Sequence, residues 1–546
     1  MFNKLKTLAS TRLARHVAAF VLAMAVLWAF PILTVHAGDP TGASLGGLAD
    51  IPAKTAGAPT LEELAAVIGH NKISINFVWT LITGFIVMFM QAGFAMVETG
   101  FTRAKNAAHT MAMNFMIYPL GMLGFWVCGF ALMFGGVGPL ATLGGENILN
   151  NPITITLFGK SMNVLGWKGF FLTGQDVYSP AIYTMFLFQM VFMDTTATIP
   201  TGSMAERWRF LPFVLYGLCV GSILYPVYGC WVWGGGWLAT LGANFGLGHG
   251  HVDFAGSSVV HLTGGVLALI GGKMIGPRVG KYNKDGSPNA IPGHHIPMAV
   301  VGTFILCFGW FGFNPGSTLA GGDLRIGVVA VNTMLAGAAG AFTAMLYMWL
   351  RYGKPDPSML ANGMLAGLVA ITAPCAFVNS VSAVLIGGVA GVLVILSVFF
   401  VERTLKVDDP VGAVSVHGMC GAWGVISLGL FADGVYGDGW NGVSGTVKGL
   451  FYGDASQFAA QCVGTLTCFV FVFASFYAFF KLVEVTLGNR VPADVELEGL
   501  DIPEMGALAY PDFVLGPGSP VGGAASTMSG APVGASSLKP VRGDAT

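Results

Sequence analysis

Long apolar runs separated by short polar loops dominate the chain from residue 73 onward. A membrane-spanning helix needs about 20 consecutive, mostly apolar residues. Scanning the chain for such runs gives eleven candidates, which begin near Ile73, Thr110, Pro180, Phe210, Gly256, Pro297, Ile326, Ser358, Val381, Ala413 and Gln457. We therefore expect an all-α membrane protein whose domain at 73–486 contains eleven transmembrane helices.

Basic residues are concentrated in alternate loops and in the final tail. These loops contain Arg103, Lys105, Arg207, Arg209, Lys273, Arg278, Lys281, Lys284, Arg351, Lys354, Arg403, Lys406, Lys481 and Arg490, whereas the opposite loops contain only Lys160, Lys168, Arg325 and Lys448. Cytoplasmic loops carry an excess of Lys and Arg. An odd number of spans then predicts an inner (plasma) membrane protein with its N-terminus outside and its C-terminus in the cytoplasm.

The first 37 residues have the pattern of a secretory signal peptide. Four basic residues precede an apolar run at about 17–33, and the run is followed by the small-residue sequence Val35-His36-Ala37. An uncleaved transmembrane helix is the alternative. We expect a periplasmic segment at 38–72, and a disordered tail at 513–546, where Gly, Pro, Ser and Ala predominate.

Composition excludes several other classes of protein. Hydrophobic residues make up 54% of the chain and charged residues only 10%, against about 25% charged in soluble domains. The net charge of −1 gives no reason to expect a nucleic-acid partner. The eight cysteines show no metal-type spacing, and His249-Gly-His251 offers too few ligands for a metal site. We expect no cofactor.

A short motif occurs twice. Asp253-Phe-Ala-Gly-Ser-Ser-Val-Val-His261 precedes the fifth span, and Asp409-Pro-Val-Gly-Ala-Val-Ser-Val-His417 precedes the tenth. Because the copies are five spans apart, they enter the membrane from opposite faces, which indicates an inverted five-plus-five repeat. Eight helical residues advance about 12 Å, so in a hydrocarbon core of about 30 Å the two imidazoles would meet near the midplane.

Together with these features, four motifs resemble the ammonium transporter family (Amt/Mep/Rh). They are DFAGSSVVHLTGG at 253–265, GWFGFNPGS at 309–317, DDPVGAVSVHG at 408–418 and AERWRF at 205–210. The resemblance covers about residues 73–512. It implies the eleven-helix ammonium transporter fold, a homotrimer in membrane lipid with one pore per subunit, and a PII-type signal protein bound at the cytoplasmic tail, 487–512.

The resemblance also implies roles for particular residues. Ammonium would bind in an outer site of Phe192, Trp233 and Ser317, with Phe188 as an external aromatic. The gate rings would be Phe192 and Phe313, and the pore residues would be His261, His417 and Trp310. Asp253 would support the outer site structurally.

Simpler structural roles stay open for the same residues. Trp233 and Trp310 are also typical of the aromatic belts at membrane interfaces. Phe192 and Phe313 are consistent with ordinary helix packing. Asp253 is placed to cap a helix, and Ser317 lies at a helix end, where hydroxyls satisfy free backbone groups.

Two further carboxyl groups lie inside predicted spans. Asp194 follows Phe192 by two residues, at a position where many relatives carry a small neutral residue, and we weigh proton handling against a structural role. Glu98 is either a functional intramembrane acid or the partner of Arg103 or Lys105. Gly412 stands where other members often carry Asp, which leaves the anchoring of the second motif open.

The function that follows is ammonium transport, with a proton removed from the ion and ammonia passing through an apolar pore. The histidines either relay that proton inward or only hydrogen-bond to ammonia. A membrane ammonium receptor that signals through the tail is the main alternative. An enzyme is not expected, because the sequence offers no nucleophile or metal set.

Overall fold

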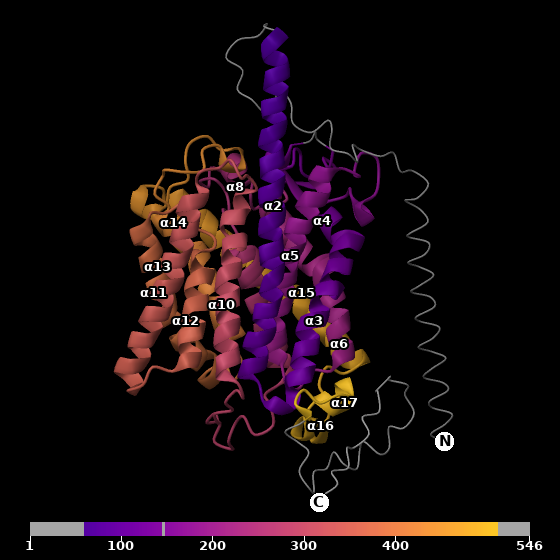
Figure 1. Cartoon of the computed structure of the whole chain (residues 1–546), viewed down its shortest axis with the longest axis vertical. Coiled ribbons are helices and arrows are strands. Elements are labelled where there is room, and N and C mark those ends of the chain that lie inside the picture. Colours follow the sequence, from indigo (N-terminus) through magenta and orange to yellow (C-terminus); the bar gives the residue numbers. More distant parts are fainter. Residues whose placement is uncertain (1–58, 145–147, 512–546) are drawn as a thin grey trace, which may run out of the picture.

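The computed structural model describes residues 59–144 and 148–511. The expected signal peptide at 1–37 and the expected tail at 513–546 lie outside the described residues. The described part is a bundle of long helices, and α2 extends beyond the others at one end (Figure 1). The opposite end, at the bottom of Figure 1, carries α16 and α17; we call it the tail face.

Helices account for nearly all of the bundle, because backbone groups inside a bilayer must find their hydrogen bonds within the chain. The long elements are α2 (Pro59–Phe101), α3 (Ala107–Gly124), α5 (Pro180–Met204), α6 (Phe210–Cys219), α9 (Thr263–Ile275), α10 (Ile296–Phe313), α11 (Ile326–Tyr352), α12 (Pro357–Ile371), α13 (Ser380–Arg403), α14 (Cys420–Phe431) and α15 (Ala455–Thr486). The shorter helices are α4 (Phe130–Phe134), α7 (Tyr225–Val232), α8 (Leu241–Phe245), α16 (Ala493–Glu498) and α17 (Asp501–Met505).

Several helices continue through π-helical turns, which are η3 (Phe125–Gly129), η6 (Val220–Leu224), η7 (Ser257–Leu262) and η9 (Val414–Met419). Short 3₁₀ turns connect other elements at η2 (Ala104–Asn106), η4 (Ala141–Leu143), η5 (Phe170–Leu172), η8 (Pro315–Thr318), η10 (Trp440–Gly442) and η11 (Leu450–Tyr452). The strands β1 (Pro152–Leu157) and β2 (Lys160–Gly166) pair antiparallel, with Leu157 opposite Lys160. Phe158 and Gly159 both have positive φ, as a tight hairpin turn requires.

The eleven predicted spans are all present as helices. Among the described residues, ten helices are long and apolar enough to cross a membrane, and α12 is shorter, with 15 residues. α12 contacts α10, α11, α13 and α14, so other helices surround it. The largest difference from the prediction is at the first span, since α2 begins at Pro59 rather than near Ile73. Hydropathy does not reveal the polar turns that extend this helix.

The two halves of the bundle repeat the same packing. In the first half α3 contacts α5 and α6, and α5 contacts α9. In the second half α11 contacts α12 and α13, and α12 contacts α14. The halves meet through α2 against α10, α9 against η9, and α14 against η7. The fold is therefore the expected all-α arrangement with an inverted repeat.

Glycines allow α2 and α10 to approach closely. A Cβ added at Gly100 would lie 2.7 Å from the backbone nitrogen of Ala299, and one added at Gly302 would lie 2.7 Å from the carbonyl oxygen of Gly93. Small residues at such crossings are the usual way for membrane helices to pack. The contact fixes the position of α10, and with it that of Trp310 and Phe313.

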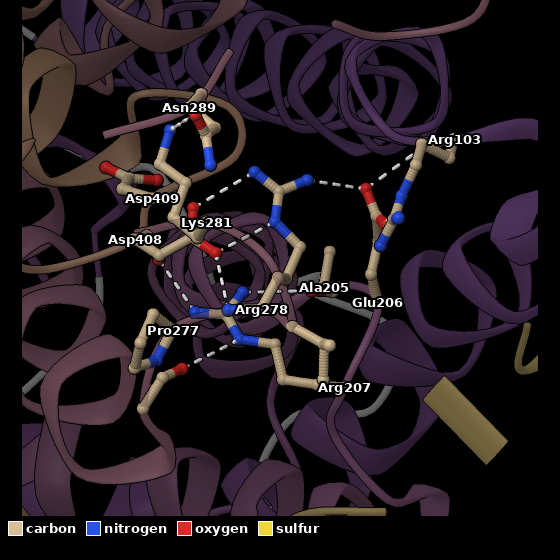
Figure 2. A network of polar contacts seen from close by, with 12 residues as sticks. Arg103, Ala205, Glu206, Arg207, Pro277, Arg278, Lys281, Asn289, Asp408 and Asp409 are labelled. Atoms are coloured by element: carbon tan, nitrogen blue, oxygen red, sulfur yellow. Dashed lines mark hydrogen bonds and ion pairs between the residues drawn. The ribbon is translucent and has the colours of Figure 1, made fainter. Parts of the chain in front are cut away.

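A buried ion-pair network at the tail face joins the four loops that follow α2, α5, α9 and α13 (Figure 2). The Arg278 guanidinium donates through Nε and Nη2 to the Asp408 carboxylate, at 2.8 and 3.0 Å, and through Nη1 to Glu206 at 2.7 Å. Glu206 also pairs with Arg103. Arg207 Nη2 donates to the Asp408 carbonyl at 2.7 Å. Burial alone would raise the pKa of Asp408, but the charges of Arg207 and Arg278 hold it well below its ordinary value.

The segment that follows α15 packs against this network. Arg490 pairs with Glu496 at 2.7 Å, and Glu496 accepts from the backbone nitrogen of Val279 at 2.6 Å. Further along, Asp501 accepts from the His109 backbone nitrogen at 3.0 Å, and Glu504 accepts from that of Phe210 at 2.9 Å. The acidic residues of this segment therefore accept from backbone nitrogens of the loop after α9 and of the first turns of α3 and α6.

The network predicts a pH dependence of stability. We expect Asp408→Asn to cost about 3 kcal/mol at neutral pH, because it leaves a buried guanidinium without its bidentate partner. A carboxyl whose pKa is lowered by folding stabilises the protein above its unfolded pKa, about 3.9, and this contribution is lost as the pH falls toward the folded pKa. The thermal midpoint of the parent should therefore approach that of Asp408→Asn between about pH 5 and pH 3.

Thermal unfolding of the detergent-purified protein across this pH range checks the expectation. The matched control is Asp356→Asn, since Asp356 only caps α12 and Asn is an equally good cap. A midpoint difference between parent and Asp408→Asn that stays constant down to pH 3 would contradict the ionic account.

Candidate functional site

A stack of aromatic rings lies between α5, α7 and α10. The ring centroids of Phe192 and Phe313 are 4.1 Å apart and the rings are stacked, with an interplanar angle of 29°. Phe188 lies 4.8 Å from Phe192, and Trp233 lies 6.0 Å from it, edge to face. Phe188 and Phe192 share one side of α5 because they are four residues apart. Phe192 and Phe313 are at most 1% exposed, so the stacked pair leaves no open passage in this structure.

The polar atoms of Trp233 and Ser317 already have partners. Trp233 Nε1 donates to the Asp253 carbonyl at 2.7 Å, which holds the indole beside Phe192. The Ser317 hydroxyl donates to the Phe313 carbonyl at 2.7 Å. Ser317 thus satisfies a free helix-end carbonyl, and its hydroxyl oxygen still has lone pairs to accept from a ligand.

The two histidines meet directly beneath this stack. His261 Nδ1 and His417 Nδ1 are 3.1 Å apart, and the ring planes differ by 24°. The His261 ring stacks on Trp310 and on Phe313, each at a centroid distance of 5.5 Å. One Nδ1 must carry the proton while the other accepts it, so a neutral pair consists of two different tautomers. The pair can therefore share a proton.

Neighbouring side chains fix the rings further. Trp310 Nε1 donates to the Thr372 hydroxyl at 3.0 Å. The Phe94 ring, on α2, lies 6.0 Å from the His417 ring. Sequence reasoning did not single out Phe94 or Thr372. The sequence does not distinguish them, because a Phe or a Thr inside an apolar run looks the same whether or not it lies beside the histidines.

The repeated Asp residues position the histidines. The Asp253 carboxylate accepts from the backbone nitrogens of Gly256, Ser257, Ser258 and Val259 and from the Ser258 hydroxyl, at 2.7–3.0 Å. The Asp409 carboxylate accepts from the Gly412 and Val414 nitrogens at 3.1 and 2.8 Å. Each cap begins the π-helical turn that carries one histidine.

The backbone conformation at position 412 explains why this chain has glycine there. Its φ is +82°, and the matching Gly256 has a φ of +116°. This left-handed region is open to glycine at little cost. The second motif is therefore anchored by Asp409 through a glycine turn, as the first is anchored by Asp253.

Asp194 is buried at 2% exposure but does not join the ring stack. It follows Phe192 by two residues, about 200° around the helix, and its electrostatic neighbour is Tyr118 on α3. Asp194 Oδ1 has no hydrogen-bond partner among the described residues.

Glu98 has different partners from those the sequence suggested. Asn114 Nδ2 donates to its carboxylate at 2.7 Å, and the Thr201 hydroxyl lies 2.9 and 2.8 Å from its two oxygens. Of the two alternatives that the sequence left open for Glu98, the pairing with Arg103 or Lys105 does not occur. Arg103 pairs with Glu206, and Lys105 donates to backbone carbonyls of α16.

The two loop histidines bond to neighbouring groups. The His249 ring lies 2.9 Å from the Gly445 carbonyl, and the His251 ring lies 2.9 Å from the Ser258 hydroxyl. No group of three or more His, Cys, Asp or Glu side chains suited to a metal ion occurs in the described ranges 59–144 and 148–511.

Comparisons with known proteins agree on one family. The model of the Ammonium Transporter Family matches residues 78–510. The ammonium transporter Amt2 of Archaeoglobus fulgidus is 46% identical over 84% of this chain and 92% of its own length. Amt1 of Haloferax mediterranei is 35% identical over 84% of this chain and 83% of its length.

Solved structures give the same fold. A structure titled Sensor Amt Protein superimposes with a TM-score of 0.68 at 35% identity, over 80% of this chain and 99% of that one. Mep2 from Candida albicans superimposes with a TM-score of 0.65 at 26% identity, over 77% of this chain and 87% of that one.

Proposed function

Because the chain belongs to the ammonium transporter family, we propose that it binds ammonium at the aromatic stack, removes one proton and conducts ammonia past the paired histidines. The observation that carries this proposal is the 3.1 Å contact between His261 and His417, buried directly beneath Phe313. The proton would cross separately, through the histidine pair, which makes transport electrogenic.

The free energy of moving the intact ion through the membrane, compared with that of moving ammonia, supports deprotonation. Moving a bare ammonium ion into hydrocarbon costs tens of kcal/mol, whereas a desolvated cation–π contact returns only about 2 kcal/mol. Phe192 and Trp233 can therefore concentrate the cation but cannot carry it through the membrane. Neutral ammonia avoids the cost.

Selectivity against potassium follows from the same step. Potassium has no proton to give up, so a proton-handling pair in an apolar pore offers it no path. An imidazole titrates near neutrality and both donates and accepts protons. The shared Nδ1 contact is the arrangement that a relay needs.

We place the protein in the inner (plasma) membrane as a homotrimer, with the tail face in the cytoplasm. Exposed apolar side chains on α2 and α10, such as Phe85, Phe89, Phe304 and Phe308, are suited to lipid or to a neighbouring subunit. Native mass spectrometry of the purified protein would count the subunits.

An ammonium receptor is the second candidate, favoured by the likeness to the structure titled Sensor Amt Protein. Such a protein would bind ammonium in the aromatic stack and signal through the tail. Ammonium binding without current or uptake in reconstituted liposomes would favour this alternative over transport.

The histidine pair gives the main prediction. Replacing His261 or His417 with Asp should alter the ammonium current and admit potassium, because a carboxylate offers a hydrated, cation-friendly path. Replacing both with Phe should lower the current about 100-fold, since a positioned acid–base group contributes at least that much. Ammonium and potassium currents from folded protein in liposomes measure both effects. Intact, ammonium-selective current in the double Phe variant would contradict the relay.

Asp194 gives a second prediction. We propose that its buried carboxyl influences proton handling, because its Oδ1 has no hydrogen-bond partner among the described residues and it follows the gate residue Phe192 by two positions. Asp194→Asn keeps the shape and removes the ionisable group, so the pH profile of the current should shift. A variant that matches the parent in current, pH profile and thermal midpoint would make Asp194 a bystander.

The tail gives a third prediction. We propose that residues 487–512 couple the subunits and form part of the docking surface for a PII-type protein. Truncation after Gly488 removes Glu496, Asp501 and Glu504, which cap backbone groups of the tail face, so transport or its regulation should weaken while membrane insertion persists. Unchanged uptake together with unchanged PII binding would count against this role.

A further inference from the structure

Glu98 is a carboxyl group inside the bundle without a basic partner among the described residues. It is 2% exposed, and its hydrogen-bond donors, Asn114 and Thr201, are both neutral. An intramembrane carboxylate that lacks a counter-charge is costly and is retained where it has a function. Neutral donors hold the group in place and leave it free to exchange a proton.

A small cavity connects Glu98 to the histidine pair. Its volume is about 20 Å³, and its lining includes Glu98, His417, Asn362, Phe94, Val97 and Ala413. One water molecule needs about 10–15 Å³ and two or more polar partners. Glu98, His417 and Asn362 supply these partners, so the cavity has the size and the chemistry to hold a water molecule.

His417 lines this cavity and has one ring nitrogen that His261 does not use. Its Nδ1 is used by His261, and its Nε2 has no hydrogen-bond partner within the described residues. A proton that arrives at Nδ1 through His261 therefore leaves most directly from Nε2. The cavity is where such a proton finds an acceptor.

We propose that Glu98 is the proton acceptor on the inner side of the histidine pair, reached through one water molecule in this cavity. The His417 imidazolium gives its Nε2 proton to the water, and the water gives a proton to the Glu98 carboxylate. The products are a neutral imidazole, a neutral carboxylic acid and the same water molecule. The proposal rests on the relay proposed above and assigns its next step.

Asp409 offers a continuation toward the tail face. It is half-buried and is an electrostatic neighbour of Glu98. Burial raises the pKa of Asp409 to about 6, against the opposing effect of its backbone hydrogen bonds. A carboxyl group with this pKa takes up and releases protons near neutral pH.

Asp194 is less well connected to Glu98. The Thr198 hydroxyl lies 3.0 Å from Gln91 Oε1 and 2.9 Å from the Asp194 backbone carbonyl, and Gln91 Nε2 donates to the Asn114 carbonyl at 2.6 Å. This chain of bonds reaches the backbone of Asp194 but not its carboxyl group. Among the described residues, the cavity shared with His417 is the connection that joins Glu98 to another ionisable group of the pore.

The test compares charge movement with ammonia conduction. Glu98→Gln keeps the shape of the side chain and one accepting oxygen for Asn114, so labelled nitrogen should still enter as neutral ammonia at the parent rate. Because its proton then stays outside, the internal pH of the liposomes should rise, whereas the parent, which carries one charge per nitrogen, should show no such rise. The ammonium current should fall roughly tenfold, since the acceptor is lost, and Glu98→Asp should recover part of it. The matched control is Glu402→Gln, which removes a carboxylate of the tail face that pairs with Lys281 and should leave the current unchanged.

The outcomes separate this proposal from the relay itself. Parent-like current in Glu98→Gln, with current lost in the double Phe variant of the histidines, would overturn the role of Glu98 and keep the relay. Intact current in the double Phe variant would instead contradict the relay. Equal loss of current and of ammonia conduction in Glu98→Gln would mark a structural role.

A second variant tests the same proton path independently of whether Glu98→Gln folds well. Ala413→Val narrows the same cavity without touching either ionisable group, so it should also lower the current while sparing ammonia conduction. Parent-like current in Ala413→Val would overturn the passage through this cavity.

Discussion

The free energy of placing a charge in a low-dielectric interior governs the polar features of this molecule. Arg278, Glu206 and Asp408 are buried at the tail face as a mutually paired network, because breaking such a set leaves an uncompensated charge. Asp253 accepts five hydrogen bonds, which compensates its burial at 2% exposure. The same constraint favours the proposed deprotonation of ammonium, because neutral ammonia carries no charge into the interior.

The inverted repeat determines where these polar groups lie. Each half provides one capped π-helical turn, and the two turns deliver one imidazole each to a shared contact. The aromatic stack lies on one side of that contact and the cavity with Glu98 on the other. In the proposed mechanism, ion binding, proton transfer and proton release would follow one another along the bundle.

The sequence was sufficient for the features that depend on periodicity and repetition. Apolar run length located the helices, and the spacing of Asp253 to His261 and of Asp409 to His417 predicted that the histidines would meet. The partners of Glu98 could not be predicted, because Asn114 and Thr201 come from helices whose packing is set by many small contacts. The start of α2 was misplaced because hydropathy does not detect polar helical turns. The cavity beside His417 depends on side chains such as Phe94 and Ala413, which no pattern distinguishes from other apolar residues.

The central claim is that nitrogen and the proton cross by separate routes after ammonium is split. The most direct measurement counts charge and labelled nitrogen together in liposomes containing the parent protein, in H₂O and in D₂O. The account predicts about one charge per nitrogen and a current that is clearly slower in D₂O, because an imidazole pair must transfer the proton. One charge per nitrogen with no solvent isotope effect would indicate passage of the intact ion, and nitrogen uptake without charge would indicate that the proton stays outside. Either result would contradict the account.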